Sequence, residues 1–395
     1  MASIRERNGS YQIRISCGCR SDGTQVIKSF TWKPDHDMTA KQRKREVMLY
    51  ADKLEKQYKY GNANGNVKLE DFADRWYAEY VEVKLKKSTQ DFYSRYMKGV
   101  KEVLGHISLH KITAIHIQDF LNEMSKRKSK KSDKLLSSTT VRLYYVTLKV
   151  ILDYAVSLGM IETNPCDKID SPKREKKEKA IYSIEDMEKL LVLLENEDFE
   201  FRMFFALAAF SGFRRGELLG LEWKDIDWDN CIIYVRRAYY YSSSFGHYTD
   251  SPKSKTSVRN NKFSPMLFEM LKRYKKYQDE RKAALGDLWQ DDDRVFAGPH
   301  GGTLSPIRPY QWLMSFLEKN NMQHTTIHSF RHFYASALIH SGVDIVTVSK
   351  SLGHASVTTT GNIYCHEFED ARARACDAIS AAVKLPSSDL EIVND

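Results

Sequence analysis

Two arginines, two histidines and a tyrosine stand in the C-terminal half of the chain at positions suited to chemistry on an anion. Arg214 follows a glycine break and precedes a new helical turn. His328 and Arg331 are three residues apart at the start of a predicted helix, so they share a face and can reach one anion. His354 follows a glycine, and Tyr364 comes ten residues later. These groups are cationic or carry a proton, which suits anion binding and proton transfer.

None of these residues is diagnostic by itself. A His and an Arg at this spacing are expected about 0.7 times by chance in a chain of this composition. A salt bridge to Glu217 would explain Arg214, and a satisfied core position would explain His354. Tyr364 is one of 22 tyrosines, any of which can be a packed aromatic. Lys255 lies in a polar β-turn together with other lysines of the same segment. Only the order of these residues and their neighbours can therefore indicate a function.

Several common catalytic signatures are absent from the sequence. It contains no GxxxxGK[ST] loop, no HExxH, no GxSxG and no GxGxxG after a strand. The six cysteines form no CxxC pair and no Cys/His run at zinc spacing, so we expect free thiols and no metal. A metal-dependent nuclease would need carboxylates such as Asp225, Asp227 or residues 291–293, which are more simply explained as loop and turn residues.

Length and composition favour a multi-domain protein with a polyanionic partner. The 395 residues are enough for two or three domains, and 42% hydrophobic with 29% charged residues excludes a disordered chain. No long apolar run occurs and the N-terminus lacks an apolar segment, so we expect a cytoplasmic protein with no membrane partner. The formal charge is +9, and its basic excess lies in the first 179 residues. This distribution suits nucleic acid, or alternatively a solvated basic surface.

Residues 1–60 are predicted to form a small domain of three strands and one helix. Tyr11, Ile13 and Ile15 alternate with polar residues, and Asn-Gly and Asp-Gly pairs mark two hairpin turns. A helical pattern over residues 39–59 opens with a basic run and leads to a Gly/Asn-rich linker. A sheet of this kind can lie in a major groove, although a structural appendage fits the pattern equally well.

Residues 66–166 are predicted to be helical, and a basic linker over residues 167–179 follows them. Leu69, Phe72 and Trp76 repeat at helical spacing. Further helices are predicted over residues 88–104, 113–124 and 139–158.

Residues 180–383 are predicted to form the larger domain, followed by a polar tail over residues 384–395. Residues 199–211 have the pattern of a buried helix, and residues 231–263 alternate like an aromatic-rich β-meander. More helices are predicted over residues 265–284, 306–319, 328–341, 345–352 and 368–383. The fold class is therefore mostly α with small antiparallel β-sheets.

In this order, the motifs resemble the catalytic signature of the tyrosine recombinases, most closely the integrases of phages and conjugative transposons. The matching segments are SGFRRGELLGL around Arg214, the β-turn with Lys255, HSFRH over 328–332, LGH ending at His354 and YCH beginning at Tyr364. The resemblance covers nearly the whole chain. It implies an N-terminal arm-type DNA-binding domain, a helical SAM-like core-binding domain, and a mixed α/β catalytic domain with a C-terminal tail helix.

The resemblance also implies a reaction. The Tyr364 hydroxyl would attack a DNA phosphodiester, form a 3′-phosphotyrosyl link and release a 5′-hydroxyl that Lys255 protonates, without metal, ATP or cofactor. Other residues would bind or position the phosphate: Arg214, Arg331, His328 and His354 as its ligands, and Glu217 and His332 as supports. Such an enzyme would be an integrase that integrates and excises a mobile element.

The partners implied are double-stranded DNA with core and arm-type sites, a homotetramer on DNA, and an accessory DNA-bending or excisionase protein. The expected DNA-contacting residues are the exposed cations of the basic segments: Arg14, Lys28, Lys41, Arg43, Lys44, Arg45, Lys126, Arg127, Lys128, Lys130, Lys131, Lys173, Arg174, Lys176, Lys177 and Arg215.

Two departures and two alternatives accompany the resemblance. Ser211 stands where many members have Thr, and the spacing from His354 to Tyr364 is one residue longer than in some branches. A sequence-specific DNA-binding regulator without catalysis would explain the basic N-terminal half equally well. A dimer-resolving recombinase of the same family is the second alternative.

Overall fold

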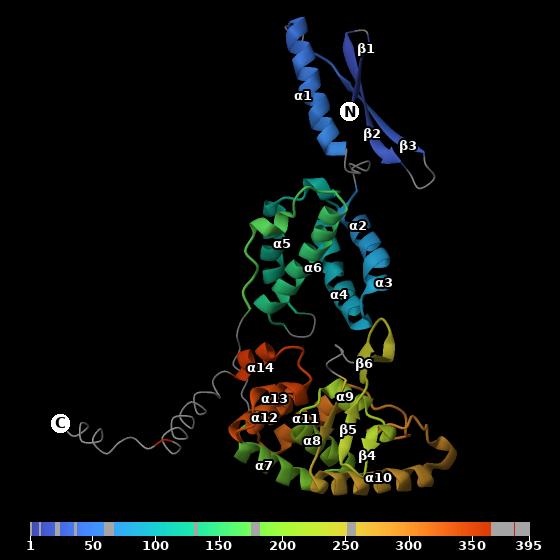
Figure 1. The fold of residues 1–395 in the computed structure, drawn as a ribbon, viewed down its shortest axis with the longest axis vertical. Helices are drawn as coiled ribbons and strands as arrows, with labels where there is room; N and C mark the ends of the chain where they lie inside the picture. The colour runs from blue at the N-terminus through green and yellow to red at the C-terminus, as the bar shows by residue number, and fades with distance from the viewer. Residues whose placement is uncertain are drawn as a thin grey trace, which may run out of the picture. The chain divides into compact units, whose positions relative to one another are not determined.

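The computed structural model describes residues 2–7, 9–19, 24–34, 38–58, 67–129, 133–174, 182–250, 258–364 and 383. The chain divides into two compact units, residues 1–177 and 178–395, and each is described by itself (Figure 1). The described residues are mostly helical, with three small antiparallel sheets, so the predicted fold class is confirmed. Within them, no helix is long and apolar enough to cross a membrane.

The first unit begins with a three-stranded antiparallel sheet in the order β1-β2-β3. Its strands are β1 (Ser3–Arg7), β2 (Ser10–Cys19) and β3 (Gln25–Trp32), and helix α1 (Ala40–Tyr58) packs on one face. Ile13 and Ile15 of β2 are buried against Val47, Ala51 and Leu54 of α1. The apolar residues that alternate along β2 thus point to the face that α1 covers, and the polar residues between them point to the open face.

The same unit continues as a bundle of helices. These are α2 (Leu69–Trp76), a π-helix (Tyr77–Val81), α3 (Glu82–Lys84), α4 (Lys87–Leu104), α5 (Ala114–Lys126) and α6 (Ser138–Ser157). The Thr113 and Ser137 hydroxyls accept backbone N–H groups at the starts of α5 and α6, which fixes where these helices begin. The apolar residues that predicted the first helix, Leu69, Phe72 and Trp76, are all buried in the core of this bundle.

The second unit is built around α8 (Phe199–Ser211), whose side chains are buried almost all round. Helices α10 (Pro265–Leu285), α11 (Arg308–Lys319) and α12 (Ile327–His340) pack against it. The other helices of this unit are α7 (Ile184–Leu193), α9 (Arg215–Gly220), α13 (Ile345–Leu352) and α14 (Val357–Tyr364). Short 3-10 turns connect elements in both units, at Leu109–Lys111, Pro165–Lys168, Leu194–Asn196, Trp223–Asp225 and Gly286–Leu288.

The predicted β-meander over residues 231–263 is wrong in its connectivity. Strand β5 (Ile232–Val235) pairs with β4 (Ile226–Asp227) on one side and with β8 (Arg259–Lys262) on the other. Between β5 and β8 in the sequence, β6 (Ala238–Ser242) and β7 (Gly246–Asp250) form a separate two-stranded hairpin. Alternation predicts that a segment is a strand but not which strand it pairs with, and here the pairing skips a hairpin.

Several predicted features lie outside the described residues. They are the Gly/Asn-rich linker, Lys130 and Lys131, the end of the basic linker with Lys176 and Lys177, the turn with Lys255, and the tail helix over residues 368–383 apart from its last residue. Tyr364 is the last residue of α14, and the description there covers its backbone but not its side chain.

Candidate active site

Arg331 is a buried cation of the second unit that two backbone carbonyls hold in place. The capping box of Thr326 and Ser329 starts α12, which places Arg331 in the first turns of this helix. Its side chain is buried, with the residue 3% exposed. Nη1 donates to the carbonyl of Gly212 at 2.8 Å and Nη2 to the carbonyl of Leu352 at 2.6 Å. The guanidinium therefore ties the end of α8 to the end of α13, and its plane is fixed before any substrate arrives.

The turn that leads to Arg214 depends on a glycine. Gly212 has φ of 60° and lies so close to Tyr334 that an added Cβ would come within 2.5 Å of the ring. The Ser211 hydroxyl accepts the backbone N–H of Phe213 at 3.1 Å. Ser211 thus acts as a local cap, a role that the hydroxyl of a Thr would also fill.

Glu217 positions Arg214, which is the N-cap residue of α9. One Glu217 oxygen accepts the backbone N–H of Arg214 at 2.9 Å, and the other accepts Nη1 at 2.6 Å. Nη2 of Arg214 donates to the carbonyl of Gly353 at 3.3 Å. Burial raises the pKa of Glu217, but the charges of Arg259 and Arg214 outweigh burial, so its pKa is lowered overall. The acid is therefore ionised and holds a partly exposed guanidinium in place.

His354 lies directly after Gly353, which ends α13 in the left-handed conformation with φ of 65°. Its Nδ1 is 2.8 Å from the hydroxyl of Thr360, a fully buried residue of α14. Burial, together with the charges of Arg331, Arg214, Arg259 and His328, lowers the pKa of His354 to about 4. His354 is thus neutral near pH 7 and can hydrogen-bond a phosphate without carrying charge.

The remaining histidines share a face of α12. His328 is exposed, and its ring lies edge-on to that of His332 with centroids 4.8 Å apart. The structure thus groups Arg214, Arg331, His328 and His354 as the sequence predicted, with Glu217 and His332 in contact with members of the group. Helix α14 carries the backbone of Tyr364, and the contact from His354 to Thr360 joins this helix to the group. Lys255 lies outside the described residues.

The cations of the N-terminal sheet fall on two different faces. Arg14 is exposed on the open face, opposite Ser3 and Ser29, whereas Lys28 lies opposite Ile15 on the face that α1 covers. Arg5 and Arg7, which were not predicted as DNA-contacting residues, are exposed on the same open face as Arg14. Extending the alternation of β2 to its neighbour β1 would have found them.

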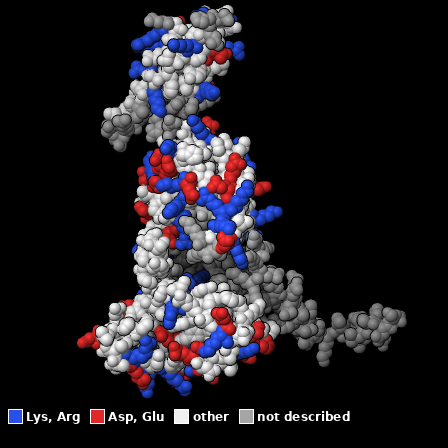
Figure 2. All heavy atoms as spheres, turned by 180° about the vertical axis from the view of Figure 1, so that it is seen from behind, with Lys and Arg blue, Asp and Glu red and all other residues white. Residues whose placement is uncertain are grey.

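The other basic segments differ in how their charges are paired. Figure 2 shows Lys and Arg predominating over the N-terminal sheet domain, whereas both signs of charge interleave over the helical bundle. In that bundle Arg127 binds Glu102 and Glu123, and Lys128 binds Asp133. Most of the remaining predicted cations within the described ranges are exposed: Lys41, Lys44, Arg45, Lys126, Lys173, Arg174 and Arg215. Arg43 is half-buried and donates to the carbonyl of Met38 at 2.8 Å.

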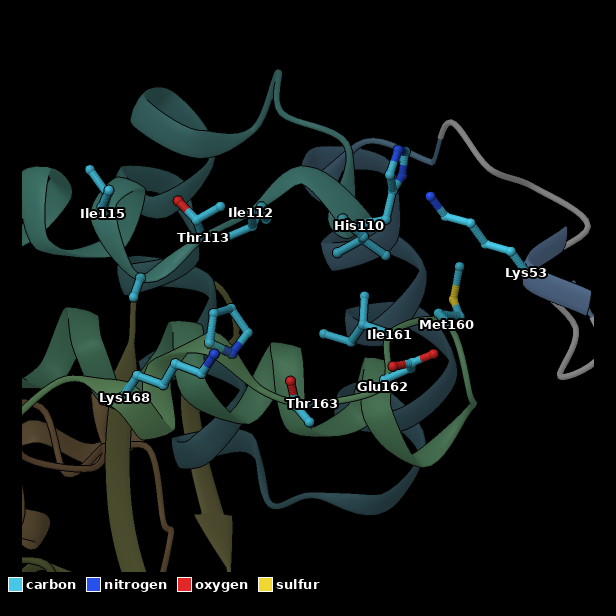
Figure 3. Close-up of a pocket in the computed structure, with 13 residues that line it drawn as sticks. Lys53, His110, Ile112, Thr113, Ile115, Met160, Ile161, Glu162, Thr163 and Lys168 are labelled. Carbon is cyan, nitrogen blue, oxygen red and sulfur yellow. The ribbon is translucent and has the colours of Figure 1, made fainter. Parts of the chain in front are cut away.

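A hollow in the helical bundle offers no comparable chemistry. Lys53 of α1 and residues from the segments 109–115 and 160–168 line it, and Figure 3 shows apolar side chains such as Ile112 and Ile161 together with Glu162 and Lys168. It belongs to the first unit, whereas the grouped arginines and histidines belong to the second.

Several of the carboxylates considered for a metal nuclease are engaged with other side chains. Asp225 is buried and binds Arg236 and Arg237, while Asp291 binds Lys282 and Asp292 accepts from Thr303. Among the residues that the structure describes, no group of three His, Cys, Asp or Glu side chains is placed to hold a metal ion.

Comparisons with known proteins show which family the chain resembles. Residues 182–370 match the phage integrase family, and residues 68–170 match the phage integrase SAM-like domain. The XerC-like tyrosine recombinase of Caldanaerobacter subterraneus subsp. tengcongensis is 28% identical over 95% of this chain and 97% of its own length. The ICEBs1 integrase of Bacillus subtilis is 26% identical over 96% of this chain and 99% of its own length.

Solved structures show the same fold. The Tn1549 transposon integrase, solved as residues 82–397 with circular intermediate DNA, has a TM-score of 0.66 at 20% identity and covers 79% of this chain and 99% of its own. A lambda integrase dimer bound to a core site has a TM-score of 0.55, and the match covers 91% of this chain and 93% of the lambda chain. The two family matches, the full-length relatives and the shared fold establish that this chain is a tyrosine recombinase of the phage integrase family, a site-specific DNA recombinase.

Proposed function

We propose that this recombinase integrates and excises a mobile element, with Tyr364 as its nucleophile. The observation that carries the assignment is the grouping of two fixed guanidinium groups and a neutral imidazole beside the helix that ends at Tyr364. The tyrosyl oxygen attacks phosphorus, the bond from phosphorus to the 5′-oxygen breaks, and a 3′-phosphotyrosyl ester forms. Because the ester replaces a phosphodiester, the reverse attack by a 5′-hydroxyl rejoins DNA without ATP.

The cations share the work on the phosphate. Arg214 and Arg331 bind the non-bridging oxygens and stabilise the charge that grows in the pentavalent transition state. His354 donates a hydrogen bond to the same phosphate, and His328 accepts the phenolic proton. Lys255 donates a proton to the leaving 5′-oxygen. Glu217 and His332 position Arg214 and His328 respectively.

The domains divide the recognition of DNA. We assign residues 1–60 to arm-type sites, residues 66–166 with the linker 167–179 to the core site, and residues 180–383 to catalysis, followed by the tail 384–395. The open sheet face with Arg5, Arg7 and Arg14 supports the first assignment. Four protomers act together on two duplexes in the cytoplasm, with an accessory bending or excisionase protein. The lambda integrase tetramer solved on a Holliday junction, which shares the fold at a TM-score of 0.55, supports the tetramer.

Covalent trapping tests the nucleophile. Full-length protein is mixed, without divalent metal, with nicked duplexes taken from the DNA that flanks its gene, and detergent-resistant protein–DNA product is measured. We expect the product with wild type and not with Tyr364→Phe. DNA binding with no covalent product from wild type would favour the regulator without catalysis. A product retained by Tyr364→Phe would assign the nucleophile to another tyrosine.

A further inference from the structure

Arg259, the first residue of β8, makes contacts that none of the family motifs assigns. Its side chain is 6% exposed. Nη2 donates to a Glu217 oxygen at 2.9 Å, Nε donates to the carbonyl of Ser351 at 2.7 Å, and the guanidinium lies 5.0 Å from the ring centroid of Phe213. One buried cation therefore contacts two segments that are distant in the sequence, residues 213–217 and Ser351.

The contacts with Glu217 and Ser351 each lead to a residue that we propose as a phosphate ligand. Glu217 is the acid that holds both the backbone and the guanidinium of Arg214. Ser351 lies in the last turn of α13, whose end turns left-handed at Gly353 and presents His354. The backbone N–H of His354 itself donates to the carbonyl of Ser349 in the same turn, at 3.0 Å. Carbonyls of a last helical turn lack helical partners, so a cation there stabilises the geometry of the turn.

The strand that carries Arg259 makes a second contact with the same turn. Asn261, two residues along β8 and on the same face, donates Nδ2 to the carbonyl of Ser351 at 3.1 Å. Strand β8 is in turn fixed by its register with β5, in which Arg259 pairs with Val235 and Asn261 with Ile233. The sheet thus provides a rigid base for the turn of His354.

We propose that Arg259 is a positioning residue for DNA cleavage, which holds Arg214, through Glu217, and the turn of His354 in one hydrogen-bonded unit. The planar guanidinium presents N–H donors in several fixed directions and can bind an acid and a carbonyl at once. A lysine ammonium is a single charged centre without this planar arrangement of donors. Without Arg259, Glu217 loses its second arginine partner, and the carbonyl of Ser351 loses one of the two side-chain donors described for it. The positive charge of Arg259 is also one of those that lower the pKa of His354.

The test compares Arg259→Gln and Arg259→Lys with wild type in single-turnover cleavage of a nicked core duplex, at protein concentrations that saturate binding. We expect the cleavage rate constant of Arg259→Gln to fall about 10- to 100-fold, as for other residues that orient a ligand group, while Kd for DNA stays unchanged. Arg259→Lys keeps a buried positive charge beside Glu217 and should recover part of the rate. Arg273→Gln, the same change at an exposed position of α10, should cleave like wild type.

A double-substitution cycle separates positioning from general loss of structure. Because Arg259 acts partly through Arg214, Arg259→Gln should cost much less rate in an Arg214→Lys background than in wild type. Equal losses of rate in both backgrounds would overturn the proposal. It would also be overturned if both Arg259 variants cleaved as fast as Arg273→Gln. The thermal unfolding midpoint of Arg259→Lys is measured beside its rate, and a rate loss that merely tracks unfolding also counts against positioning.

The inference rests on the proposed function, and the two can fail separately. If wild type forms no covalent product, the proposed function fails and the inference fails with it. If wild type forms the product and the Arg259 variants cleave normally, only the role of Arg259 is wrong.

Discussion

The two regions that carry basic side chains differ in how those side chains are held. In the second unit, Arg331 and Arg259 are buried, and each donates to groups from two different segments. On the N-terminal sheet, Arg5, Arg7 and Arg14 are exposed along one open face. Stabilising a transition state requires donors fixed before the reaction, whereas binding a phosphate backbone requires charge within reach. We therefore expect the buried Arg331 and Arg259 to affect cleavage, and the exposed arginines of the sheet to affect DNA affinity.

The first substitution tests the buried side of this comparison. Arg331→Lys keeps the charge but cannot donate in one plane to both Gly212 and Leu352. We expect the rate constant for covalent product formation to fall about 10²- to 10³-fold or more, with DNA affinity unchanged. The measurement is single-turnover trapping beside a native-gel titration of the same duplex.

Its control is Arg202→Lys on α8, a half-buried arginine that lies over the ring of Phe199. It should cleave like wild type. If Arg331→Lys instead lost DNA binding in proportion to cleavage, Arg331 would be an affinity residue, and burial would not separate the two roles.

The second substitution tests the exposed side. Replacing Arg5, Arg7 and Arg14 together with Gln should weaken binding to an arm-type duplex about 10²-fold and reduce the slope of log K against log salt by about 3. Cleavage of a nicked core duplex should not change, because these residues act only through affinity. The measurements are fluorescence anisotropy over a salt series and trapping on the core duplex.

The matched control is Lys28→Gln, which removes a charge from the face that α1 covers. It should leave the salt slope unchanged. The change in salt slope caused by Lys28→Gln is compared with one third of the change caused by the triple arginine substitution. If the two were equal, DNA would not lie on the open face.

Local periodicity was sufficient to predict most helices of this fold. Residues 199–211 and 345–352 were predicted as helices with the bounds that α8 and α13 have. The π-helix at Tyr77–Val81 was missed, because over one turn its apolar spacing resembles that of an α-helix. The pairing of β5 with β8 was missed for a different reason, since register between distant strands leaves no local pattern.

The site could be predicted only as far as the motifs extend. The order of the motifs predicted the grouping of Arg214, Arg331 and His354 around one location. Arg259 was missed because its partner Ser351 lies 92 residues away, and Thr360 because a threonine in a helix has no distinctive signal. Such supporting residues are defined by contacts between distant segments, which one sequence does not reveal.

A third substitution addresses a supporting residue of the buried site. Thr360→Val keeps the shape of this fully buried side chain but removes the hydroxyl that contacts Nδ1 of His354. We expect cleavage to slow about 10-fold, because the imidazole loses the partner that fixes its tautomer and orientation. Thr360→Ser, which keeps the hydroxyl, should restore most of the rate. Equal rates for the Val and Ser variants would show that packing, not the hydrogen bond, holds His354.

The smallest expected effect concerns proton binding by His354 in the absence of DNA. The folded state lowers the pKa of His354 to about 4, from its ordinary value near 6.5. Between these values the unfolded chain binds a proton that the folded chain does not, so His354 makes the folded state less stable as the pH falls through this range. His354→Asn removes this contribution. The difference in free energy of unfolding between His354→Asn and wild type should therefore shift in favour of the variant from pH 7 to pH 4.8, measured by denaturant titration with tryptophan fluorescence. A difference that stays constant with pH would mean that His354 is solvated like an exposed histidine, and the buried character of the site would not extend to its imidazole.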